Sequence, residues 1–139
     1  MTDSPLFSVL IIDDDPVTGF LTGAVLLESR QFDVPVIFSD ARKAFRYLLH
    51  ECLALKRKSL PHLLLLDVSS GNGSGLDMVE ALKDICPEAF DQMVVCGLVS
   101  PQYVPSQAQN PPLDFYWSTP LNREDLEQLL CFLENRVNQ

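Results

Sequence analysis

Four consecutive leucines, in the segment His62-Leu63-Leu64-Leu65-Leu66-Asp67, are the clearest strand signal in the chain. A short apolar run without alternation is typical of a strand buried on both faces, as in parallel sheets that have helices on both sides. The run stops abruptly at the carboxylate of Asp67. The segment therefore predicts a central strand with an acidic residue at its carboxyl end.

A similar arrangement stands near the start of the chain. Phe7 to Ile12 is an apolar run interrupted only by a serine, and the acidic stretch Asp13-Asp14-Asp15 follows it directly. Pro16 then suits the first turn of a helix, which is expected to extend to about Arg30. Helical spacing places three apolar residues on one face of that helix: Phe20, Ala24 and Leu27.

Strands and helices alternate along the rest of the chain. Further strands are expected at residues 35–38, 92–99 and 115–118, and further helices at 41–55, 76–85 and 121–137. Between the last two strands, Pro101, Pro105, Pro111 and Pro112 leave room for only a turn or two of helix. The order predicts one α/β domain over residues 1–139, a flavodoxin-like, doubly wound, five-stranded parallel sheet of order 2-1-3-4-5 with a short or disrupted fourth helix.

Composition and charge exclude several classes of function. The 139 residues are 47 % hydrophobic and 21 % charged, which suits a soluble globular domain. The formal net charge of -9 argues against direct binding of nucleic acid or of an anionic membrane. The four cysteines lack the spacing of a metal or redox motif, and we see neither a signal peptide nor a membrane span, so a cytoplasmic location is expected.

The acidic residues are expected to meet at one edge of the sheet. Ligands of open parallel sheets bind outside the carboxyl ends of the strands, where Asp13 and Asp14 follow the first strand and Asp67 follows the third. Gathered carboxylates repel one another, and a hard cation such as Mg2+ relieves that repulsion. A carboxylate can also act as a nucleophile toward a phosphoryl group. We therefore expect a metal-dependent phosphoryl-transfer site here.

Three segments resemble the response-regulator receiver family of two-component signalling. They are Leu10-Ile11-Ile12-Asp13-Asp14-Asp15-Pro16, then Leu64-Leu65-Leu66-Asp67-Val68 with Gly75 closing the loop, and Tyr116 followed by Thr119-Pro120. The resemblance extends from Val9 to about Leu133. It implies a receiver domain without an output domain, in which Asp67 is the phosphoacceptor.

The resemblance also implies roles for the neighbouring residues. Asp13 and Asp14 are expected to bind Mg2+ together with Asp67 and the backbone carbonyl of Ser69. Tyr116 falls at the aromatic position whose side chain changes orientation on activation. The peptide bond before Pro120 is usually cis in this family.

Two positions depart from the family pattern. Thr119 stands where the family has a lysine that contacts the phosphoryl group, and Gly97 stands where it has a threonine or serine. A hydrogen bond to a charged group contributes about 1.5–3 kcal/mol, so loss of the lysine is expected to slow phosphoryl transfer roughly 10- to 100-fold. Loss of the hydroxyl at position 97 is expected to weaken transmission from the phosphoryl group toward Tyr116.

Three functions remain open from the sequence. The first is a non-enzymatic receiver that takes a phosphoryl group from a histidine kinase or phosphotransfer protein and acts through a downstream protein partner. The second is an atypical receiver that works as a phosphorylation-independent interaction module. The third is a Mg2+-dependent phosphohydrolase similar to haloacid dehalogenases, because Asp13-Asp14-Asp15-Pro16-Val17 contains an Asp-x-Asp-x-Val string.

Overall fold

A single five-stranded parallel sheet forms the centre of the molecule. The computed structural model describes residues 6–54, 60–68, 74–99, 113–118 and 121–137. The strands stand in the order β2-β1-β3-β4-β5, which confirms the predicted topology. Their bounds are β1 Val9–Ile12, β2 Val36–Phe38, β3 Leu63–Asp67, β4 Val94–Val99 and β5 Phe115–Ser118.

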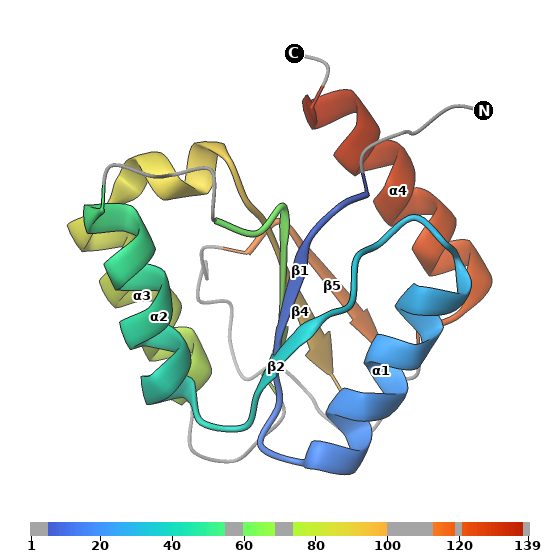
Figure 1. The fold of residues 1–139 in the computed structure, drawn as a ribbon, viewed down its shortest axis with the longest axis horizontal. Helices are drawn as coiled ribbons and strands as arrows, with labels where there is room; N and C mark the ends of the chain where they lie inside the picture. Colours follow the sequence, from blue (N-terminus) through green and yellow to red (C-terminus); the bar gives the residue numbers. More distant parts are fainter. Residues whose placement is uncertain (1–5, 55–59, 69–73, 100–112, 119–120, 138–139) are drawn as a thin grey trace.

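Helices cover both faces of this sheet. In Figure 1, α1 and α4 lie on one face, and α2 and α3 lie on the other. The helix bounds are α1 Pro16–Glu28, α2 Ala41–Leu53, α3 Ser74–Ile85 and α4 Arg123–Val137, with a 3-10 helix, η2, at Pro87–Asp91. The short or disrupted fourth helix expected from the prolines falls within 100–112, outside the described residues.

Successive residues of each central strand point to opposite faces, so the apolar runs fill two separate cores. Leu64 and Leu66 pack toward α2 and α3, while Leu63 and Leu65 pack toward α1 and α4. All four leucines are fully buried. This accounts for the absence of alternation in the run, because a strand covered on both faces has no polar side.

The predicted apolar face of α1 is not the buried one. The side of α1 that faces the sheet consists of Gly19, Thr22, Gly23 and Leu26. The predicted residues point outward, with Phe20 66 % exposed and Leu27 42 % exposed. The small residues let the helix lie close to the sheet, since even a Cβ atom on Gly19 would stand 3.2 Å from Cγ2 of Ile37. Because α1 is apolar all round, its pattern could not identify the inner face.

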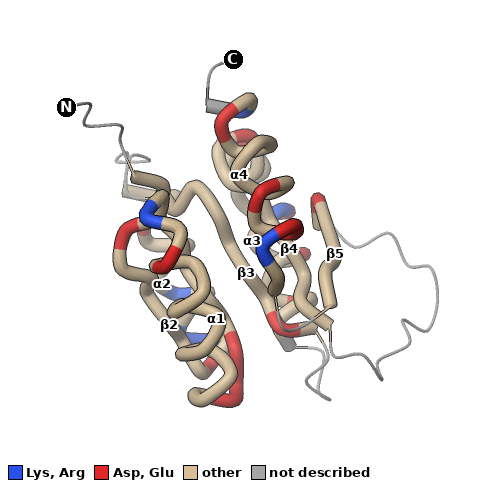
Figure 2. The backbone as a smooth tube through the Cα atoms, turned by 90° about the vertical axis from the view of Figure 1, so that its right-hand side faces the viewer, with Lys and Arg blue, Asp and Glu red and all other residues tan. Residues whose placement is uncertain are grey.

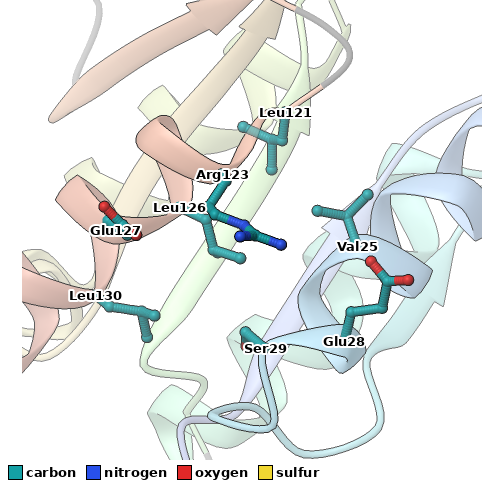
Figure 3. A pocket seen from close by; sticks show the side chains of 8 residues that line it. All are labelled: Val25, Glu28, Ser29, Leu121, Arg123, Leu126, Glu127 and Leu130. Atoms are coloured by element: carbon teal, nitrogen blue, oxygen red, sulfur yellow. The ribbon is translucent and has the colours of Figure 1, made fainter.

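A groove separates α1 from α4 on their shared face of the sheet (Figure 3). Its volume is about 570 Å3. Figure 3 shows Arg123 extending from α4 toward α1, with Glu127 on its own helix and Glu28 across the groove. The remaining lining residues are Val25, Ser29, Leu121, Leu126 and Leu130. No helix among the described residues is both long and apolar enough to cross a bilayer.

His62 connects the starts of β1 and β3. It lies at the amino end of the sheet, opposite the carboxyl end where the acidic residues meet. Its Nδ1 atom accepts a hydrogen bond from the backbone N–H of Ser8 at 3.0 Å, and its ring packs edge-on against Phe7. Burial lowers the pKa of His62 below its ordinary 6.5, an effect that the charge of Asp33 partly opposes. The folded protein therefore holds this histidine neutral, with Nδ1 as an acceptor.

Acidification is expected to destabilise the protein through His62. Because the pKa of His62 is lower in the folded state, its contribution is complete above pH 6.5 and is lost as the pH falls through the folded pKa. The substitution His62→Asn keeps an acceptor for Ser8 but does not titrate. We expect the free energy of urea unfolding to fall more steeply between pH 7.5 and 5.5 in the wild type than in His62→Asn. Equal slopes would contradict the role assigned to this histidine.

Candidate metal site at the carboxyl end of the sheet

Three carboxylates converge where β1 and β3 end. The two strands pair in parallel, with Ile12 opposite Leu66, so Asp13 and Asp67 leave the sheet side by side. One carboxylate oxygen from each of Asp13, Asp14 and Asp67 lies within 4.8 Å of the other two. The convergence of these residues, predicted from their positions at strand ends, is confirmed.

This oxygen cluster fits a small, hard cation. Ligand oxygens around one Mg2+ lie roughly 3–4 Å apart when each bond is about 2.1 Å long. The observed separations therefore require only a small inward movement of the side chains. The three donors are all carboxylate oxygens, the ligand type that Mg2+ prefers. Asp14 is exposed and Asp67 is partly exposed, so water can complete the coordination.

Asp13 is the innermost of the three acids, with only 2 % of its surface exposed. Burial, together with the negative charges of Asp67 and Asp14, raises the pKa of Asp13 to about 6, against the opposing effect of a hydrogen bond from the backbone N–H of Asp15. That hydrogen bond is 2.9 Å long and fixes one carboxylate oxygen. Ionisation of Asp13 in the folded protein therefore costs free energy, and a bound cation would reduce that cost.

Asp15 has a structural task and does not join the cluster of three. Its carboxylate caps α1 by accepting hydrogen bonds from the backbone N–H groups of Val17 and Thr18 and from the Thr18 hydroxyl. These bonds lower the pKa of Asp15. Within the acidic stretch, Asp13 and Asp14 are therefore candidate metal ligands, whereas Asp15 is a helix cap.

Two glycines let α1 and α3 lie close to the carboxyl end of the sheet, where the three carboxylates meet. A Cβ atom on Gly19 of α1 would stand 3.4 Å from Cβ of Asp13 and 3.2 Å from Cγ2 of Ile37. On Gly75, near the start of α3, a Cβ atom would stand 2.5 Å from Cδ1 of Leu66, the residue before Asp67. Gly75 was singled out from the sequence, whereas Gly19 was missed because its proximity to Asp13 depends on how α1 lies against the sheet.

Gly97 and Tyr116 face each other across β4 and β5. They are direct partners in the parallel register, and the tyrosine ring covers the space above the glycine. A Cβ atom on Gly97 would stand 3.1 Å from two carbons of the Tyr116 ring and 3.0 Å from Cδ1 of Leu113. Tyr116 keeps 42 % of its surface exposed. The space that a threonine or serine would occupy is thus taken by the ring.

Adding a side chain at position 97 is expected to conflict with Tyr116. Gly97→Ala brings a methyl group within 3.1 Å of the ring, so it should destabilise the wild type more than a Tyr116→Ala variant, in which only the contact with Leu113 remains. We expect a coupling energy of about 1 kcal/mol in a double-mutant cycle measured by urea unfolding. Additive effects of the two substitutions would show that the two side chains do not compete for this space.

Two hydrogen bonds of Asp114 link the start of β5 to β4. The Asp114 carboxylate accepts a hydrogen bond from the backbone N–H of Val95 at 2.8 Å, and the Asp114 N–H donates to the Val95 carbonyl at 2.7 Å. No sequence pattern predicts these two hydrogen bonds, because an acid before a strand usually indicates only a turn. Three expected site residues, Ser69, Thr119 and Pro120, lie outside the described residues.

Comparisons with known proteins identify the fold. No family model and no curated protein matches the sequence. Among solved structures, a two-component response regulator from Cytophaga hutchinsonii superposes with a TM-score of 0.79 at 22 % identity, covering 94 % of this chain and 99 % of that one. A CheY-like receiver domain from Methanospirillum hungatei JF-1 gives a TM-score of 0.70 at 18 % identity, with coverage of 95 % and 98 %.

A third solved structure agrees with these two. A putative response regulator from Chloroflexus aurantiacus J-10-fl gives a TM-score of 0.72 at 16 % identity, covering 94 % of this chain and 99 % of that one. The match extends over nearly the full length in each case and includes the parallel sheet of order β2-β1-β3-β4-β5. The chain has the fold of response-regulator receiver domains.

Proposed function

We propose that this chain is a receiver domain that accepts a phosphoryl group on Asp67 in a Mg2+-dependent reaction. The observation that supports this most strongly is the convergence of Asp13, Asp14 and Asp67 within 4.8 Å at the carboxyl edge of the sheet. In open parallel sheets this edge is where ligands bind. The phosphodonor would be a histidine kinase or phosphotransfer protein, and the protein would act through a downstream protein partner rather than as an enzyme.

The residues of the site have different roles in this reaction. Asp67 is partly exposed, so a carboxylate oxygen can reach an incoming phosphorus atom. That oxygen attacks the phosphorus of a phosphohistidine, the P–N bond breaks, and an acyl phosphate forms on Asp67 while histidine leaves. Asp13, Asp14 and Asp67, with the Ser69 carbonyl, would hold Mg2+, which supplies positive charge to the transferring oxygens.

A small-molecule phosphodonor tests this directly. We expect intact mass spectrometry to show one added phosphoryl group after incubation with acetyl phosphate and Mg2+, and none with EDTA. The adduct should be absent from Asp67→Asn and present in Asp91→Asn, which removes an exposed carboxylate elsewhere. An adduct that persists in Asp67→Asn, or its absence from the wild type, would contradict the proposal.

The second candidate is an interaction module that works without phosphorylation. The packing of Tyr116 over Gly97 supports it, because the ring takes the space of the hydroxyl that would link a phosphoryl group to this surface. A partner captured equally by the wild type and Asp67→Asn would favour this function. The phosphohydrolase alternative loses support, since its second acid, Asp15, is engaged in capping α1.

We propose a cytoplasmic location for either function. Cys86, Cys96 and Cys131 are free thiols, and the first two are buried. Buried free thiols suit a reducing compartment.

A further inference from the structure

Positive charge in this acidic chain is concentrated around α2. Six of the ten Lys and Arg residues of the sequence lie between positions 42 and 58, together with only one of the nineteen acidic residues. Three of the six belong to α2 and are exposed, namely Arg42, Lys43 and Arg46. We call these three residues the α2 basic strip. Acidic residues predominate in the rest of the sequence, and Figure 2 shows them in red over much of the fold, including α3 and α4.

The α2 basic strip is unfavourable for the stability of its own helix. Arg42 and Lys43 stand in the first turn, which has no acidic residue, so their charges oppose the helix dipole. Arg46 follows Arg42 by four residues and Lys43 by three, the spacings at which like charges repel each other on a helix. Lys43 is also the third residue after the N-cap Asp40, where a glutamate would complete a capping box. Residues that cost a helix stability in this way indicate a role in recognition.

The acids of the chain itself leave most of the strip unneutralised. Within the described residues, the strip makes one ion pair, in which Arg42 Nε lies 4.0 Å from Asp40 Oδ1, and the Arg42 side chain is 89 % exposed. Lys43 and Arg46 have no acidic side chain within that distance in the part of the chain that the structure describes. Both charges can therefore pair with carboxylates of another molecule.

A small apolar hollow lies beside the strip, between α2 and α3. Its volume is about 270 Å3, which is below the usual size of a small-molecule pocket but sufficient for one large side chain. The hollow is lined by Ala41, Arg42 and Phe45 of α2 and by Asp77, Met78 and Ala81 of α3. Arg42 belongs both to the hollow and to the strip, so one ligand can occupy the two together.

We infer that α2 is a docking surface for an acidic segment of a partner protein. Carboxylates of the segment pair with the α2 basic strip, and one apolar side chain of the segment enters the hollow. Arg42 and Arg46 are about 6 Å apart along the helix, which is the span of two residues in an extended chain. Acids at alternate positions of the segment therefore face the strip, as in peptide recognition by clustered arginines.

The surroundings of the strip favour a peptide over a larger polyanion. The strip is one helix wide, and the exposed acids Asp77, Glu80 and Asp84 lie on the neighbouring α3. A DNA duplex or an anionic membrane that covered α2 would also meet these acids and be repelled by them. A single peptide segment can avoid them, and only a peptide supplies an apolar side chain for the hollow.

Fluorescence anisotropy of a labelled synthetic peptide, titrated with the full chain, tests this inference. The probe has glutamates at alternate positions, a phenylalanine at its centre and serines elsewhere. We expect a dissociation constant between about 10 μM and 1 mM, rising with salt concentration, and no binding of the same peptide with lysines in place of glutamates. Because Mg2+ and a phosphodonor are left out, the result does not depend on the proposed function.

Charge reversal in the strip separates recognition from folding. Lys43→Glu and Arg46→Glu should each weaken binding of the acidic peptide roughly 3- to 30-fold. Lys43→Glu should also unfold at a higher urea concentration than the wild type, because the glutamate completes the capping box. The matched control is Lys83→Glu, which makes the same change at an exposed residue in the last turn of α3 and should leave binding unchanged.

A substitution that fills the hollow tests the apolar contact separately. Ala81→Leu should weaken binding of the phenylalanine peptide but not of a peptide with serine at that place. Equal effects on the two peptides would contradict a role of the hollow.

Several results would overturn the inference as a whole. They are a wild type that does not bind the acidic peptide, and a control Lys83→Glu that weakens binding as much as Arg46→Glu does. Tighter binding of duplex DNA or of phosphatidylserine vesicles would assign the strip to a different class of ligand. A dimer in sedimentation equilibrium that Arg46→Glu dissociates would assign it to a second copy of this chain.

Discussion

Replacing Asp13 with asparagine is expected to stabilise the metal-free protein and to remove most of its response to Mg2+. The wild-type carboxylate is 2 % exposed, and its pKa is raised from 3.8 to about 6. Two pKa units correspond to about 3 kcal/mol, which is an upper bound for the cost of ionising this group in the folded state. The asparagine oxygen can still accept the hydrogen bond from Asp15. We therefore expect Asp13→Asn to raise the free energy of unfolding at pH 7.5 by about 1–3 kcal/mol without metal.

The stabilisation that Mg2+ provides should be smaller in Asp13→Asn than in the wild type. If about 10 mM Mg2+ is ten times the dissociation constant, the wild type gains about 1.4 kcal/mol on metal binding. Asp13→Asn should gain little, because it loses the innermost charged ligand of the cluster. Urea unfolding with and without Mg2+ measures both effects, with Asp91→Asn as the control for loss of one negative charge. Asp13 has no part in metal binding if its variant gains as much from Mg2+ as the wild type does.

Thr119→Lys is expected to accelerate phosphorylation of Asp67 by roughly 10- to 100-fold. The sequence places Thr119 before Pro120, where the resemblance implies a lysine. A hydrogen bond from an ammonium group to the transferring phosphoryl oxygens contributes about 1.5–3 kcal/mol, and each 1.36 kcal/mol is a factor of ten in rate. The measurement is the initial rate of adduct formation with acetyl phosphate and Mg2+, followed by intact mass.

A neutral side chain of similar length controls for shape. Thr119→Met extends the side chain without adding charge, so it should react at the wild-type rate or slower. If Thr119→Lys is no faster than Thr119→Met, the absent lysine is not what limits the reaction. The adduct must also disappear when Asp67→Asn is combined with Thr119→Lys, since otherwise the new lysine itself has been modified.

Much of the fold could be predicted because the strands are buried on both faces. The run Leu63–Leu66 has no polar alternation, and it is indeed buried between two layers of helices. The last helix, α4, was also predicted from its sequence. Asn122 caps it through a hydrogen bond from the Asp125 N–H to the Asn122 side-chain oxygen, and Leu126, Leu129 and Leu133 are buried at helical spacing, with Leu130 partly buried beside them.

Side-chain orientation on α1 could not be predicted from the sequence. Apolar residues occur all round this helix, so tertiary packing rather than periodicity determines which side is buried. The sheet accepts the side with Gly19 and Gly23, because only small residues let the helix approach Pro35 and Ile37. Large residues such as Phe20 are left in solvent as a result.

The candidate site was predictable in part. The positions of Asp13, Asp14 and Asp67 follow from strand ends and parallel topology, both of which sequence patterns reveal. The separate role of Asp15 depends on backbone geometry at the start of α1. Likewise, the register that places Gly97 opposite Tyr116 depends on how β4 and β5 pair.

A crystal structure with Mg2+ and beryllofluoride, a mimic of the phosphoryl group, tests the central claim most directly. We predict beryllofluoride attached to a carboxylate oxygen of Asp67, and Mg2+ bound by oxygens of Asp13 and Asp67 at about 2.1 Å. A structure in which Asp67 stays unmodified while Mg2+ binds elsewhere would contradict the account.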